Sequence, residues 1–275
     1  MFSRRECRSL AIMPASVLSR PGADLSYHET GAGPLLGYSH GIFFSSATED
    51  AIGVFPWSQL AGTRRIVRYD QRAHGRSTGQ PDPDAYVWPS LAGDLLAMAN
   101  HVGGAEPLDW AGSSMGTASL LWAATQRPAR FRRLVLIIPP TVRETRVAAA
   151  QTYRAGADMV QRRGKAAWMA AVRAFPPPAV FADLPTWRFD ADVPEELLPA
   201  LLRGAAASDL PDDDALRAIT QPVLILAWET DPVHPVSSAR LLADTLPDAR
   251  LHVSDTVADI RAWPNRIESF LAEAL

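Results

Sequence analysis

The sequence has a single cysteine, Cys7, and a single lysine, Lys165, among 275 residues. One cysteine excludes a disulfide framework and a cysteine-rich metal site within one chain. The net charge is only −3, so the charge balance gives no reason to expect nucleic acid as a partner. No apolar run approaches the roughly 20 residues that a membrane span needs. We therefore expect a cytoplasmic protein that neither binds nucleic acid nor crosses a membrane.

The first residues are positively charged, as in a secretory signal, but the apolar run that follows is short and ends at Pro14. We interpret residues 1–13 as a flexible tail. The rest of the chain is long enough to bury roughly three quarters of its unfolded surface. One large domain, or one domain with an insertion, can therefore be stable without a disulfide or a metal ion.

Short apolar runs alternate with helical patterns along most of the chain. The runs are continuous and bounded by Gly, Pro or Asp, as in parallel strands that are covered on both faces. They lie at residues 35–39, 65–69, 107–111, 134–138, 223–227 and 250–253, and the helical patterns lie at 90–101, 115–126, 237–245 and 263–275. This alternation predicts an α/β fold with a doubly wound, mostly parallel sheet, and an antiparallel hairpin of residues 15–18 and 25–28 at its edge.

The alternation stops between Thr141 and Leu216. This stretch has helical patterns at 145–163, 165–174 and 195–207, but no convincing strand. A helical insertion between two strands of a sheet is expected to lie over the strand ends. We therefore predict a core domain of residues 14–140 and 217–275 and a helical cap of residues 141–216.

The sequence Gly112-Ser113-Ser114-Met115-Gly116 stands between a predicted strand and a predicted helix. A turn this sharp strains the backbone of its central residue, and small residues two positions away on either side relieve the crowding. The backbone N–H of Met115, at the helix N-terminus, could then stabilise an oxyanion. The strand before the motif and the helix after it favour a nucleophilic serine at Ser114 over a chance Gly/Ser loop.

From Gly31 to Pro139 the sequence resembles the α/β-hydrolase family. His40-Gly41 matches the His-Gly pair that follows the family's third strand, and the segment from Tyr69 to Ser77 is similar to its Y-D-x-R-G-x-G-x-S loop, with Ala73 in place of the first Gly. The resemblance implies that the backbone N–H of Ile42 is the second oxyanion donor. It covers nearly the whole chain outside the predicted cap and tail.

In this family the acid follows the strand after the cap, and a histidine near the end of the chain completes the triad. Asp231 matches the acid, with Glu229 as its competitor. The position of the family's histidine is occupied by Asp259, and a carboxylate with an ordinary pKa near 4 is a poor base for a serine hydroxyl.

The missing histidine leaves three alternatives for the base. His234, three residues after Asp231, is on a loop that lines the pocket in this fold and could reach Ser114. His40 or His252 could serve instead, although we expect His252 to point into a packed face of the last strand. The third alternative is a site that needs no such base.

Three functions remain open. The first is a serine hydrolase, with Ser114, His234 and Asp231 as catalytic residues, acting on an ester or other acyl bond. The second is a lyase, cyclase or isomerase that uses the oxyanion hole to stabilise an enolate. The third is a degenerate member of the family that binds a ligand.

The predicted cap is rich in aromatic residues, which favours a small, largely apolar substrate. These are Trp168, Phe175, Phe181, Trp187 and Phe189. As substrate contacts we predict His40, Phe43, Trp168 and Trp187, although the simpler interpretation of His40, as of Asp70, Arg72 and His74, is that it ties loops together. No cofactor or metal motif is present, and the sequence leaves open whether the protein is a monomer or a homodimer.

Overall fold

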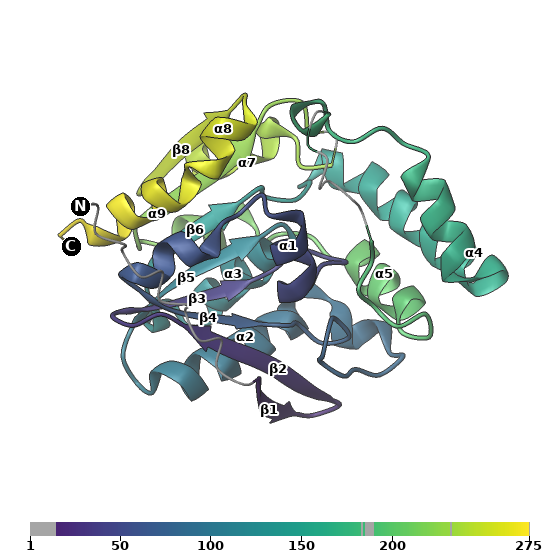
Figure 1. Cartoon of the computed structure of the whole chain (residues 1–275), viewed down its shortest axis with the longest axis horizontal. Helices are drawn as coiled ribbons and strands as arrows, with labels where there is room; N and C mark the ends of the chain where they lie inside the picture. The colour runs from purple at the N-terminus through teal and green to yellow at the C-terminus, as the bar shows by residue number, and fades with distance from the viewer. Residues whose placement is uncertain (1–14, 183, 185–189, 232, 275) are drawn as a thin grey trace, which may run out of the picture.

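The computed structural model describes residues 15–182, 184, 190–231 and 233–274. Eight strands form one twisted sheet with the order β1-β2-β4-β3-β5-β6-β7-β8 (Figure 1). The strands are β1 (Ser16–Arg20), β2 (Ala23–Thr30), β3 (Leu35–Ser39), β4 (Arg65–Tyr69), β5 (Leu108–Ser113), β6 (Phe131–Ile137), β7 (Val223–Trp228) and β8 (Ala249–Ser254). The β1–β2 hairpin is antiparallel at one edge, and all pairs from β4 through β3 to β8 are parallel. The predicted α/β class and mostly parallel sheet are confirmed.

The central strands are covered on both faces, as their continuous apolar runs predict. Alternate residues of β7 enter different cores: Val223 and Ile225 face one hydrophobic cluster, and Leu224 and Leu226 face the other. The first core contains α2 (Trp88–Gly103), α3 (Met115–Gln126) and α7 (Val236–Thr245). The second is closed by α1 (Ser46–Ile52), η1 (Trp57–Gly62), α8 (Val257–Arg261) and α9 (Trp263–Ala272).

Between β6 and β7 the described residues form helices and no strand. They are α4 (Glu144–Arg173), η4 (Ala179–Phe181), α5 (Leu198–Ala206) and α6 (Asp213–Arg217). The long helix α4 is interrupted at Gly164, whose φ of 80° and ψ of 163° are not helical. This break falls between the two helices predicted for 145–163 and 165–174. In Figure 1, α4 and α5 lie side by side at the end of the molecule opposite α9.

Several short elements were not predicted from the sequence. Helices α1 and α8 span seven and five residues, too few for a clear helical period. Helix α1 begins instead with a capping box between Ser45 and Thr48. Helix α9 ends at Ala272, short of the predicted end, and the predicted tail of residues 1–13 lies outside the described residues. Within the described part of the chain, no helix is long and apolar enough to cross a bilayer.

Candidate active site

Ser114 occupies the corner between β5 and α3. Its φ of 51° and ψ of −111° are unfavourable for a residue with a side chain. The corner is also crowded, because a Cβ on Gly112 would lie 2.4 Å from the Gly116 carbonyl oxygen and one on Gly116 would lie 2.1 Å from the Ser39 oxygen. Both glycines are therefore required for the chain to pass this corner. The strand–turn–helix arrangement that the sequence predicts is present.

His234 lies between Ser114 and Asp231. Its Nε2 is 2.8 Å from Ser114 Oγ, and its Nδ1 is 2.9 Å from Asp231 Oδ2. The other carboxylate oxygen of Asp231 accepts hydrogen bonds from the backbone N–H groups of Val233, at 2.8 Å, and of His234, at 3.0 Å. The loop after β7 therefore places both acid and imidazole beside the corner. The structure brings together the three residues that the sequence suggested for catalysis.

The electrostatic setting keeps Asp231 ionised. Asp231 and Ser114 are 8% and 5% exposed. Burial by itself would raise the pKa of Asp231, but the adjacent His234 ring and the hydrogen bonds that the carboxylate accepts lower this pKa below its usual value. An ionised Asp231 accepts the Nδ1–H of His234. The lone pair of Nε2 then points to the Ser114 hydroxyl.

The competing carboxylate Glu229 makes no such contact. Its side chain is exposed, and its backbone N–H donates to the carbonyl oxygen of Ser254 in β8. Thr230, the residue that follows, has a φ of 61° as the chain turns towards Asp231. The geometry therefore favours Asp231 as the partner of the imidazole.

Asp259, in the expected place of the family's histidine, belongs to a separate cluster. Its Oδ2 is 2.7 Å from His252 Nε2 and accepts from Ser254 Oγ at 2.7 Å, and its Oδ1 accepts from Arg266 at 3.0 Å. The little burial it has would raise the pKa of Asp259, but these hydrogen bonds lower it to about 2. The expectation that His252 points into a packed face is wrong, because its side chain is 26% exposed and contacts the Asp259 carboxylate.

Two backbone N–H groups next to Ser114 carry no hydrogen bond to any described residue: those of Ile42 and Met115. Met115 is the first residue of α3, where N–H groups lack partners within the helix. Ile42 follows Gly41, and a Cβ on Gly41 would lie 3.3 Å from Ser114 Cβ. Near Ser114, two N–H groups thus have no partner among the described residues; that they form an oxyanion hole stays a prediction.

His40 and His74 tie the surrounding loops together. His40 is fully buried, its Nδ1 lies 2.8 Å from the Gly41 oxygen and its Nε2 accepts from the Gln71 N–H at 2.8 Å. His74 Nε2 accepts from the Phe43 N–H at 3.3 Å. Burial lowers the pKa of both rings, that of His74 to about 3, so both are neutral at ordinary pH. The prediction that His40 contacts substrate is corrected, since neither ring nitrogen is free to do so.

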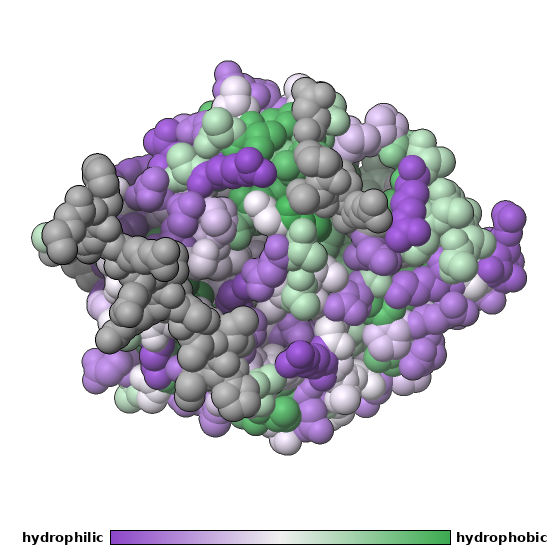
Figure 2. Space-filling view, viewed as in Figure 1, coloured by the Kyte–Doolittle hydropathy of each residue, from purple (hydrophilic) through white to green (hydrophobic). Residues whose placement is uncertain are grey.

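Two aromatic rings of helix α4 reach the loop beside Ser114. The Phe43 ring is 5.2 Å from that of Trp168 and 6.5 Å from that of Tyr153. Phe181, in contrast, is a core residue packed 5.0 Å from Trp228, and Phe175 is 77% exposed. Trp187 and Phe189 lie outside the described residues. Figure 2 has the same view as Figure 1. On this face, apolar residues gather in the area between α8 and α4.

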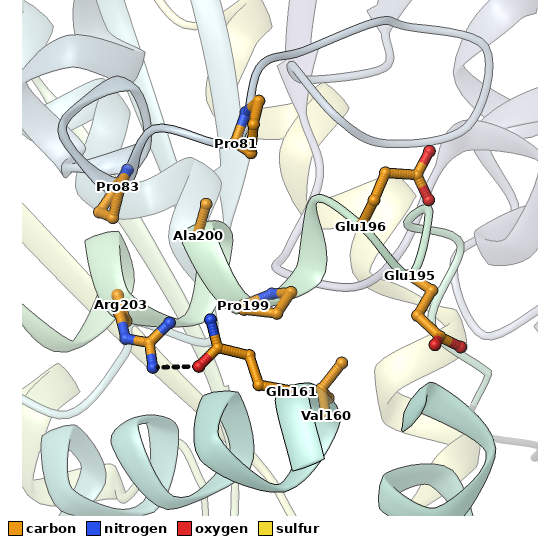
Figure 3. A pocket seen from close by; sticks show the side chains of 9 residues that line it. All are labelled: Pro81, Pro83, Val160, Gln161, Glu195, Glu196, Pro199, Ala200 and Arg203. Atoms are coloured by element: carbon orange, nitrogen blue, oxygen red, sulfur yellow. Dashed lines mark hydrogen bonds between the residues drawn. The ribbon is translucent and has the colours of Figure 1, made fainter. Parts of the chain in front are cut away.

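A separate cavity of about 310 Å³ lies between α4, α5 and the loop around Pro83 (Figure 3). None of the residues around Ser114 lines it. Among the described residues, no group of three His, Cys, Asp or Glu side chains could hold a metal ion.

The sequence did not indicate one contact to the site, that of Asp192, which hydrogen-bonds to the loop of Phe43 and Ser45. No sequence signal marks it, because its partners are far away in the chain.

Known proteins share the fold of this chain. The model of the α/β hydrolase fold family matches residues 57–260. The 3-oxoadipate enol-lactonase 2 of Acinetobacter baylyi is 28% identical over 199 residues, which cover 68% of this chain and 69% of that protein.

Two solved structures have the same fold. The enol-lactonase from Burkholderia xenovorans LB400 has a TM-score of 0.74 at 20% identity, covering 94% of this chain and 100% of that one. A thermophilic esterase from Thermogutta terrifontis has a TM-score of 0.73 at 21% identity, covering 95% and 98%. At these identities the likeness shows the fold alone.

Proposed function

Because the chain belongs to the α/β-hydrolase fold family, we propose that it is a serine hydrolase acting on a carboxylic ester or another acyl bond. The proposal depends mainly on one observation, the 2.8 Å contact between His234 Nε2 and Ser114 Oγ. A serine hydroxyl is a weak nucleophile until a base within hydrogen-bond reach takes its proton. In this chain the base, His234, is on the same loop as Asp231. It is not at the position of the family's histidine, which Asp259 occupies.

The chemistry follows from the roles of these groups. Ser114 Oγ attacks the carbonyl carbon while His234 Nε2 takes its proton, and the Asp231 carboxylate stabilises the imidazolium that forms. The carbonyl oxygen becomes an oxyanion and accepts hydrogen bonds from the N–H groups of Ile42 and Met115. His234 then gives its proton to the leaving alcohol, which leaves an acyl group on Ser114. A water molecule then attacks the acyl carbon while the same imidazole takes its proton, and His234 returns this proton to Ser114 Oγ as the bond between Oγ and the acyl carbon breaks and the acid product leaves.

The surroundings support a small, largely apolar acyl substrate. In this proposal residues 14–140 and 217–275 form the core, and residues 141–216 form a cap whose Trp168 and Tyr153 approach Phe43. Lactones and esters are the first substrates to test, since related proteins are named as an enol-lactonase and an esterase. The missing base favoured the non-hydrolytic alternative, and the fold alone left the ligand-binding alternative open. The contact of His234 with Ser114 supports hydrolysis over both.

The direct test uses p-nitrophenyl esters of increasing acyl length. We expect wild-type protein to hydrolyse the short esters and Ser114→Ala to lose at least about 10³-fold in kcat. Ser113→Ala is the matched control, because it removes a hydroxyl from the same turn but not the one that faces His234. Turnover in Ser114→Ala equal to that of wild type would exclude this function, as would a wild-type protein without activity on any ester or lactone.

A further inference from the structure

Residues 191–193 connect helix α4 with the loop that carries Ile42 through hydrogen bonds; we call this segment the strap. Lys165 Nζ donates to the carbonyl oxygens of Ala191, at 2.6 Å, and Val193, at 2.8 Å. The N–H and the carbonyl oxygen of Asp192, the residue between them, bond instead to the loops that follow β3 and β4.

Asp192 binds the core domain with its backbone and its side chain. Its N–H donates to the Phe43 oxygen at 2.7 Å, and its own carbonyl oxygen accepts from the Gly75 N–H at 3.0 Å. Its Oδ2 accepts from Ser45 Oγ at 2.6 Å. Ser45 is fully buried and caps α1. One residue of the strap thus makes three hydrogen bonds to the two loops beside the candidate active site.

Phe43 is the residue through which the strap can act on Ile42. Its φ of 76° is unfavourable for a side chain of this size, so surrounding contacts must hold it. Its N–H donates to His74, and its carbonyl oxygen accepts from Asp192. Both peptide groups of Phe43 are therefore fixed. The peptide on its N-terminal side follows Ile42 directly, so the direction of the Ile42 N–H depends on this anchoring.

Further contacts fix the position of Lys165. It follows the break at Gly164, and its backbone N–H donates to Glu195 Oε2 at 3.1 Å. One helical turn later, Trp168 packs against the Phe43 ring. Figure 3 shows Glu195 on the segment that leads into α5, and a further tie between α5 and α4 from Arg203 to Gln161, at 2.9 Å.

We infer that Lys165 is a positioning residue for the oxyanion donor Ile42, acting through the strap and Phe43. This inference rests on the proposed function, which gives Ile42 its role. Without Nζ, the carbonyl groups of Ala191 and Val193, two residues that are each 2% exposed, lose this donor, and a buried acceptor without a donor is costly. The strap then loosens, and Phe43 relaxes from its strained conformation.

Lys165→Met tests the inference, because it keeps the length of the side chain and removes its charge. Arg163→Met is the matched control: Arg163 is exposed on the same helix, and its side chain makes no hydrogen bond to any described residue. The first readout is hydrogen exchange of the backbone amides of residues 41–45, which needs no substrate. We expect exchange at least about tenfold faster in Lys165→Met and unchanged in Arg163→Met.

The second readout is ester hydrolysis. Misplacing one oxyanion donor should lower kcat in Lys165→Met by about 10- to 100-fold, with KM changed by less than about threefold. Asp192→Ala removes only the side-chain hydrogen bond to Ser45. It should change the exchange rate and kcat in the same direction as Lys165→Met, but by a smaller factor. This variant replaces Lys165→Met in the test if Lys165→Met does not fold. Wild-type exchange or wild-type kcat in folded Lys165→Met would overturn the inference. An inactive wild type would refute the proposed function instead, and the exchange measurement would still decide the role of Lys165.

Discussion

Asp231→Asn is the substitution whose effect follows most directly from the hydrogen bonds of the site. In the wild type, Oδ1 of Asp231 accepts from two backbone N–H groups, those of Val233 and His234. Only an oxygen can accept these bonds, so the carbonyl oxygen of the new side-chain amide must take the place of Oδ1. The NH2 group of this amide must then take the place of Oδ2 and face His234 Nδ1, which in the wild type lies 2.9 Å from that oxygen.

This exchange reverses the tautomer of the imidazole. Facing an NH2 donor, Nδ1 must accept, and the ring proton moves to Nε2, which then donates to Ser114 Oγ instead of accepting from it. The serine loses its base while the shape of the site is kept. The same change in a related arrangement of Ser, His and Asp lowers kcat about 10⁴-fold. This factor corresponds to about 5 kcal/mol of transition-state stabilisation.

The assay is the initial rate of hydrolysis of a short p-nitrophenyl ester at neutral pH. Glu229→Gln is the control, because it makes the same chemical change on an exposed side chain two residues earlier, and it should keep the wild-type rate. Circular dichroism and the melting temperature establish that each variant is folded. Folded Asp231→Asn with a kcat within tenfold of the wild-type value would refute the assignment of Asp231 and the tautomer argument with it.

Two further predictions concern stability. Gly116→Ala places a Cβ 2.1 Å from the Ser39 oxygen, so the corner must shift, and we expect the free energy of unfolding in urea to fall by about 3 kcal/mol or more; an unchanged value would contradict the crowded corner. Asp259→Asn should lower the free energy of unfolding by about 1 kcal/mol at pH 6 and leave kcat within about twofold of the wild-type value. The pKa of Asp259 falls from 3.8 to about 2 on folding. The difference in the free energy of unfolding between wild type and Asp259→Asn should therefore be full above about pH 4 and shrink as the pH falls towards 2. A difference that grows on acidification would refute this role of Asp259.

The sequence predicted the elements whose signals are local. The corner at Ser114 could be placed because the glycines, the preceding strand and the following helix are contiguous in the chain. The break in α4 could be placed because Gly164 stands between two helical patterns. The corner and the break follow from the preferences of a few neighbouring residues. Asp231 could be proposed as the acid only because the resemblance to the α/β-hydrolase family implies an acid after this strand.

The contacts that complete the site join residues far apart in the chain. Ser114 and His234 are 120 residues apart, so the sequence could offer His234 as one base among several but could not choose it. Ser45 and Asp192 are 147 residues apart, and nothing near either residue indicates their bond. The sequence also left two interpretations of His40 open, a substrate contact and a tie between loops, and its two hydrogen bonds among buried loops support the second.

The proposed mechanism requires that His234 activates Ser114 as a nucleophile. A serine-reactive fluorophosphonate probes this activation, with intact-protein and peptide mass spectrometry as the readout. We expect a single adduct on Ser114 in the wild type, no adduct in Ser114→Ala, and labelling at least about 10³-fold slower in His234→Ala. An adduct on another residue, or labelling of Ser114 at the wild-type rate in folded His234→Ala, would refute the role of His234.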